Sequence, residues 1–135
     1  MDAVAVTKGK GWQGQVKRFG VALQIRKSSK SRRNGGSVGP ERQGKIMFTV
    51  PRAGQMGFHR RVDKGKRVIM ISSDPAAVLP KDGFPHYGAI KCPYLLVEGS
   101  VPGPAKRPVL LRNSVEVKQP RKPAIKEINR DSKQG

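Results

Sequence analysis

Eight prolines leave no room for a long helix between residues 51 and 108, and they stand at positions 51, 75, 80, 85, 93, 102, 104 and 108. Inside a helix, the proline ring removes a backbone donor and clashes with the preceding turn. The runs between the prolines are short, rich in β-branched or aromatic residues, and bounded by Gly, Pro, Asn or Asp, as is typical of strands. We predict a helical turn near Asp74–Val78 and strands at Val4–Thr7, Val16–Phe19, Ile46–Val50, Val68–Ser72, Tyr94–Glu98 and Val109–Arg112.

These runs predict an all-β fold, a small barrel or sandwich whose loops outweigh its core. Hydrophobic residues make up 36% of the 135 residues, below the roughly 45–50% of ordinary domains. The longest apolar runs, Val68–Ile71 and Tyr94–Val97, are far shorter than the ~18 residues of a membrane span. Because the first residues show no signal-peptide pattern, the sequence reads as that of a cytosolic protein.

Positive charge dominates the chain and is concentrated in one region. Lys and Arg number 28 against 9 Asp and Glu, a formal charge of +19, and residues 8–67 hold 17 of these cations. Arg26–Arg33 places five cations in eight positions. Alone in water such a run is extended or disordered, and a solvated or localisation-type run is one interpretation. Its internal position between strand-like segments favours a loop that threads among phosphates, so nucleic acid is the expected partner and a membrane is not.

The glycine pattern Gly9-x-Gly11-x-x-Gly14 matches a dinucleotide-binding fingerprint, but its context does not. Gly20 interrupts any following helix, and the acidic residue expected about 20 positions on is missing. The glycines still allow the backbone to approach phosphate oxygens. The counter-charges would come from Lys8, Lys10, Lys17 and Arg18.

The residues with reactive side chains are few and isolated. His59 and His86 are the two histidines and Cys92 is the one cysteine, so no metal-ligand spacing and no nucleophile–base pair appear. We expect no catalysis, no cofactor and no metal. His59 precedes two arginines and is predicted to contact a phosphate or a base edge, whereas Cys92 is predicted to be a small buried hydrophobe. Trp12 has two interpretations, stacking on a base or plugging the core.

Three motifs in a fixed order carry a resemblance to a known family: Thr7–Gly14 followed by Val16–Gly20, then Pro51–Arg61, then Leu96–Arg107. They resemble the C-terminal half of the large-subunit ribosomal protein L-three family. The Phe58-His59 pair resembles archaeal and eukaryotic members. The resemblance implies part of a translation-protein-type β-barrel, interrupted by a long basic extension that runs through large-subunit ribosomal RNA toward the peptidyl transferase centre.

The resemblance also divides the chain. Residues 1–25 would hold barrel strands and the glycine-rich loop, 26–55 the extension, 56–117 further barrel strands and loops, and 118–135 a mostly irregular polar tail. It implies that the chain is a structural component of the large subunit and supports assembly of the subunit. It also implies contacts with neighbouring ribosomal proteins. We also expect a separate chain, similar to the N-terminal half of the family, to complete the barrel.

The expected RNA contacts combine the basic residues of these segments with a few polar and aromatic ones. At the tip, Gly39-Pro40 is followed by Glu41, where family members usually carry a tryptophan. Two other classes stay open: a free-standing basic RNA-binding module or assembly factor, and an enzyme that holds a nucleotide in the glycine loop. The residues expected to contact RNA, if the chain is the ribosomal protein that it resembles, are Lys8, Lys10, Trp12, Lys17, Arg18, Arg26, Lys27, Lys30, Arg32, Arg33, Arg42, Lys45, Arg52, Gln55, His59, Arg60, Arg61, Lys66, Arg67, Lys106 and Arg107.

Overall fold

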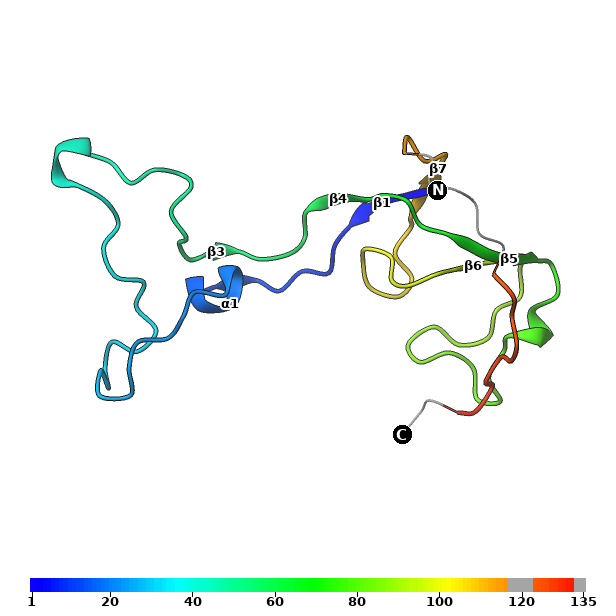
Figure 1. Cartoon of the computed structure of the whole chain (residues 1–135). Coiled ribbons are helices and arrows are strands. Elements are labelled where there is room, and N and C mark those ends of the chain that lie inside the picture. Colours follow the sequence, from blue (N-terminus) through cyan, green and yellow to red (C-terminus); the bar gives the residue numbers. More distant parts are fainter. Residues whose placement is uncertain (117–122, 133–135) are drawn as a thin grey trace. The chain divides into compact units, whose positions relative to one another are not determined.

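The computed structural model describes residues 1–116 and 123–132, which fall into two compact units (Figure 1). The first, here the sheet unit, comprises Met1–Lys8 and Arg60–Gly135. The second, here the basic unit, is Gly9–His59. No helix in the described part of the chain has the length and apolar character needed to cross a membrane.

The sheet unit is built around β1 (Asp2–Val6), the central strand of a three-stranded antiparallel sheet. β4 (Arg60–Asp63) pairs with one edge of β1 and β7 (Leu110–Arg112) with the other. Ala3, Val4 and Ala5 of β1 are buried. β1 is therefore both the central strand of this sheet and its most buried strand.

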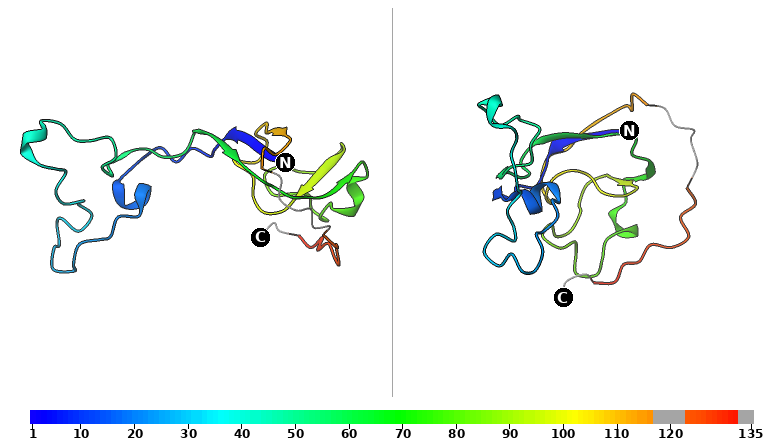
Figure 2. Two further views of the ribbon diagram at one scale, coloured as in Figure 1. Left: turned by 45° about the horizontal axis from the view of Figure 1, so that its top comes forward. Right: turned by 60° about the vertical axis from the view of Figure 1, so that its left-hand side comes forward.

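A second pair of strands lies beside a short helical turn. β5 (Val68–Ser72) pairs antiparallel with β6 (Tyr94–Val97), with a register shift between Val68 and Met70 (Figure 2). After β5 the chain forms the 3₁₀ turn η2 (Pro75–Ala77). The carboxylate of Asp74 accepts a hydrogen bond from the Ala76 amide and caps this turn. The predicted helical turn and both strands are confirmed.

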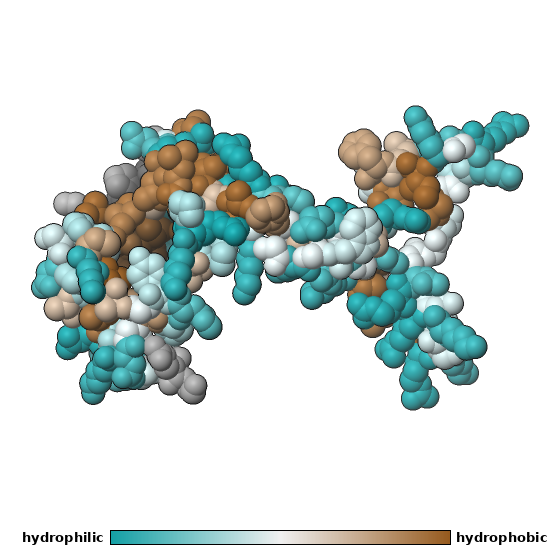
Figure 3. All heavy atoms as spheres, turned by 180° about the vertical axis from the view of Figure 1, so that it is seen from behind, coloured by the Kyte–Doolittle hydropathy of each residue, from teal (hydrophilic) through white to brown (hydrophobic). Residues whose placement is uncertain are grey.

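The hydrophobic core is small. In the part of the chain that the structure describes, the buried hydrophobic residues are Ala3, Val4, Ala5 and Val78. Ile71 is 74% exposed and Leu110 is 65% exposed, and a broad hydrophobic surface of the sheet unit faces solvent (Figure 3). The described strands form separate small sheets and no closed barrel. The all-β class is confirmed at this coarse level.

The basic unit is mostly irregular and is closed by a two-residue ribbon. β2 (Trp12–Gln13) pairs antiparallel with β3 (Gly54–Gln55). Two backbone hydrogen bonds extend the ribbon, from Lys10 N to Met56 O and from Met56 N to Gly11 O, each 2.9 Å long. We call residues 10–13 and 54–56 the neck. Beyond it lie the helix α1 (Gln15–Phe19) and the 3₁₀ turn η1 (Glu41–Gln43).

Two predicted strands are wrong. The segment Val16–Phe19 is helical, because Gly14 precedes the helix and Gly20, with φ 70°, ends it in the left-handed conformation. Ile46–Val50 contains a turn instead, closed by a 3.2 Å hydrogen bond from Val50 N to Met47 O. In the tail, residues 123–132 contain no regular element, as predicted, while 118–122 and 133–135 lie outside the described residues.

Candidate nucleic-acid interface

Arg18 holds the neck of the basic unit together. From α1 its side chain donates to two carbonyls of the segment that leads into and through β3, from Nε to Gln55 O (3.2 Å) and from Nη1 to Arg52 O (3.0 Å). Its guanidinium lies over the Phe19 ring, 4.9 Å from the centroid. A Cβ at Gly54 would come within 3.0 Å of the Arg18 guanidinium, so glycine leaves the space that this side chain occupies. Arg18, predicted from sequence as a phosphate contact, is engaged with the backbone.

Glutamines pin the loop that carries the five-cation run. Gln24 N donates to Arg32 O over 2.9 Å, and the Gln24 side chain donates to Asn34 O over 3.3 Å. The Gln15 side chain donates to Arg33 O over 2.8 Å. The acceptors are backbone carbonyls in the run or next to it, so these contacts do not use its Lys and Arg side chains, which are exposed. Both glutamines were missed by sequence reasoning, which followed charge, and no local pattern marks an amide that bonds ten or more residues away.

Most of the sequence-predicted phosphate contacts present their cations to solvent. The exposed residues among them are Lys8, Lys10, Lys17, Arg26, Lys27, Lys30, Arg32, Arg33, Arg42, Lys45, Arg52, Arg60, Arg61, Arg67 and Lys106. The basic unit contains eleven Lys and Arg residues and one side-chain carboxylate, that of Glu41. None of the ion pairs formed among the described residues includes Glu41. The basic unit therefore carries a strong, nearly uncompensated positive charge.

Aromatic side chains of the basic unit are exposed as well. The exposed fractions are 75% for Trp12, 55% for Phe19, 97% for Phe48 and 65% for Phe58. The interpretation of Trp12 as a core plug is wrong. Phe58 has φ 56°, a left-handed backbone that bulky residues seldom adopt. Exposed rings among exposed cations suit both the faces of nucleobases and the phosphates between them.

Three cations predicted to bind RNA make contacts inside the sheet unit. Arg107 donates from Nη1 to the carbonyls of Val6 (2.9 Å) and Thr7 (3.0 Å). Lys66 forms a 2.7 Å ion pair with Asp63, and Arg67 forms a 3.1 Å ion pair with Glu98. In the basic unit, the Gln55 amide donates to Met56 O and Gly57 O, each over 3.3 Å. These four side chains contact the protein itself, and they stabilise the fold that carries the exposed cations.

The sheet unit also contains a buried carboxylate that the sequence did not reveal. Asp2 is 0% exposed, and it accepts hydrogen bonds from Gly65 N (3.0 Å), Ser114 Oγ (2.9 Å) and Arg112 Nε (3.2 Å). The Gly65 amide contributes most to holding the pKa of Asp2 below its ordinary value; desolvation opposes this shift, and Ser114 and Arg112 reinforce it. This cluster connects β1 to the loop that follows β4 and to the end of β7.

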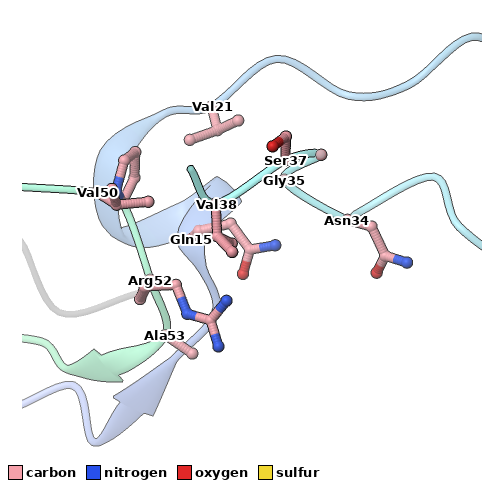
Figure 4. A pocket seen from close by; sticks show the side chains of 11 residues that line it. Gln15, Val21, Asn34, Gly35, Ser37, Val38, Val50, Arg52 and Ala53 are labelled. Atoms are coloured by element: carbon pink, nitrogen blue, oxygen red, sulfur yellow. The ribbon is translucent and has the colours of Figure 1, made fainter. Parts of the chain in front are cut away.

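A hollow of about 400 Å³ lies in the basic unit beside α1 (Figure 4). Val21, Val38 and Val50 line it, together with Gln15 and Arg52. None of its lining residues carries a carboxylate, an imidazole or a thiol, so the hollow offers no acid–base pair. No group of three or more His, Cys, Asp or Glu suited to a metal ion occurs among residues 1–116 and 123–132. Cys92 is exposed, which overturns the prediction that it is buried.

Comparison with known proteins gives consistent matches. The family model described as "Ribosomal protein L3" matches residues 1–135. The chain is 54% identical over 115 residues to the large ribosomal subunit protein uL3 of Pyrobaculum arsenaticum, covering 84% of this chain and 34% of the relative. It is 48% identical over 139 residues to that of Methanococcus vannielii, covering 100% of this chain and 42% of the relative. The chain thus spans between a third and a half of the length of these relatives.

Proposed function

The chain belongs to the ribosomal protein L3 family, and from that membership we propose that it is a structural constituent of the large ribosomal subunit in the cytoplasm. The family is structural and not enzymatic. The chain's own task in this proposal is to bind large-subunit ribosomal RNA and to support assembly of the subunit beside neighbouring ribosomal proteins.

The composition of the basic unit carries the proposal. Its eleven cations stand against one carboxylate, and its four aromatic side chains are exposed. Lys and Arg that neutralise phosphates release condensed counterions, which is the main sequence-independent source of affinity for RNA. A segment with so little to bury becomes fully ordered when RNA supplies the opposing surface.

We propose that the far end of the basic unit approaches the peptidyl transferase centre. η1 begins directly after Gly39 and Pro40 and lies well away from the neck within this unit (Figure 1). Glu41 is its first residue. Because a carboxylate within 4 Å of a phosphate costs roughly 1 kcal/mol in water, we expect Glu41 to turn toward a base edge or an arginine once RNA is bound.

The open hydrophobic surface of the sheet unit supports a further partner. Val4, Val6, Val109 and Leu110 line a shallow apolar groove on the three-stranded sheet. Exposed apolar surface of this kind marks an interaction site. We propose that a polypeptide similar to the N-terminal half of the family covers this surface and completes a translation-type barrel.

Co-sedimentation tests the function. A tagged copy of the chain is expressed in Methanococcus cells, and large subunits are washed at high salt and sedimented. An integral component stays with the subunits after the wash. Loss of the chain in the wash would instead identify a transient RNA-binding module or assembly factor. A saturable shift on titration with nucleotides would favour an enzyme.

A further inference from the structure

Phe48 presents almost its entire side chain to solvent. It is 97% exposed, and its neighbours Ile46 and Met47 are 43% and 50% exposed. Leaving a large apolar side chain in water costs free energy in proportion to its exposed area. Three adjacent exposed ones within the strongly basic unit are therefore a feature that a partner surface should explain.

The local backbone accounts for this exposure. Gly44, with φ 62°, ends η1 in the left-handed conformation and starts a new direction of the chain. A four-residue turn begins three residues later, at Met47. It is closed by a 3.2 Å hydrogen bond from Val50 N to Met47 O. Phe48 and Thr49 occupy the central positions of this turn, which lie farthest from the flanking strands of chain. The sequence thus folds so that the ring is displayed.

The charge around Phe48 selects the kind of partner. Arg42, Lys45 and Arg52 flank it in sequence, and all three are exposed. A nucleobase offers an aromatic face next to phosphates, so a ring between cations complements unpaired RNA on both counts. An ordinary apolar protein surface would leave these cations without counter-charge.

We propose that Phe48 is a base-stacking residue, whose ring stacks on an unpaired nucleobase while Arg42 and Lys45 neutralise the adjoining phosphates. This inference rests on the proposed function, since it names how the basic unit engages RNA. Stacking is tolerant of base identity, because every base has an aromatic face. Phe48 would therefore fix the depth and orientation of the turn in RNA and would not select a sequence.

The test measures binding of the full chain to two labelled single-stranded oligomers of equal length and charge. One is oligoadenylate, and the other is an abasic ribose-phosphate oligomer. The variants are Phe48→Ala, Phe48→Leu and Phe48→Trp, and Ile71→Ala is the matched control because Ile71 is an apolar side chain 74% exposed in the sheet unit. Lys45→Ala reports the charge contribution.

Stacking predicts that Phe48→Ala and Phe48→Leu weaken oligoadenylate binding ~5-fold or more, since loss of a stacking ring costs at least that much. Both variants should leave binding of the abasic oligomer unchanged, and Phe48→Trp should retain full affinity. Lys45→Ala should weaken binding of both oligomers. In a Trp12→Phe background, the tryptophan of the Phe48→Trp variant should be quenched by oligoadenylate and not by the abasic oligomer.

Equal losses on both oligomers would overturn the proposal, as would full affinity in Phe48→Leu, which would show that the aromatic ring is not needed for binding. A chain that binds neither oligomer would contradict the proposed function itself. A chain that binds both, without regard to Phe48, would contradict only the stacking role.

Discussion

Arg112 donates from Nε to the buried carboxylate of Asp2 over 3.2 Å, although 110 positions separate the two residues. The same carboxylate accepts from Gly65 N on the loop after β4. One charged group therefore joins the central strand to the loop after β4 and to the end of β7, and these hydrogen bonds favour its ionised form.

The pH dependence of this contact follows from the lowered pKa of Asp2. The ordinary value is 3.8, and the hydrogen bond from Gly65, with Ser114 and Arg112, lowers it in the folded state. A depressed carboxyl pKa stabilises the sheet above the unfolded value, and this contribution is lost as pH falls through the folded value. In an NMR titration, the Gly65 amide proton should follow Asp2 with a midpoint below 3.8. A midpoint at or above that value would contradict the cluster.

Arg18 should act through the neck and not through its charge alone. Arg18→Lys keeps the charge but cannot reach Gln55 O and Arg52 O in the same geometry. We expect local opening of the neck to become easier by about 1 kcal/mol, seen as faster hydrogen exchange of the Met56 amide. Lys17→Arg, one position away on α1, is the control. Unchanged exchange in Arg18→Lys would show that the guanidinium does not close the neck.

The five-cation run should set the salt dependence of RNA binding. Replacing Arg32 and Arg33 with alanine removes two exposed charges while the Gln24 and Gln15 contacts to their carbonyls can persist. The slope of log K against log salt should become shallower by about one to two units. Arg67→Ala, which removes a cation paired with Glu98, should change the slope less. An unchanged slope in the double variant would mean that the run does not lie against phosphates.

The isolated chain should unfold without a cooperative transition. Its buried hydrophobic residues, in the part that the structure describes, are three from β1 and Val78. So small a core cannot couple the separate sheets into one unit. Circular dichroism of the RNA-free chain should change gradually with temperature. A sharp melting transition would contradict the small core and the proposed second polypeptide.

How far the sequence predicts this fold depends on how local the determinants are. β5 and β6 are predictable because runs such as Val68–Ile71 are rich in β-branched residues and bounded by turn residues. α1 was misread because Val16 and Phe19 favour strands, while the glycines at 14 and 20 decide the helix ends. β4 was missed because three of its four residues are charged, and it is a strand because β1 needs a partner.

The sequence predicts the charge of the candidate interface. It does not predict which charged side chains stay exposed and which form hydrogen bonds that hold the fold together. Exposed cations such as Arg32 follow from composition. The roles of Arg18, Arg107 and Asp2 depend on carbonyls and amides between 34 and 101 positions away, which no local pattern encodes. Phe48 was predicted as part of a strand, and its exposure became visible only through the turn at Met47–Val50.

Cross-linking of the chain to RNA within large subunits tests the proposed RNA-binding role of the basic unit most directly. Salt-washed subunits carrying the tagged chain are irradiated with ultraviolet light, and cross-linked peptides are identified by mass spectrometry. Nucleotide-bearing peptides should map mainly to Gly9–His59, with the loop around Phe48 and the run Arg26–Arg33 among them. Cross-links confined to the sheet unit, or their absence from subunits that contain the chain, would contradict this role.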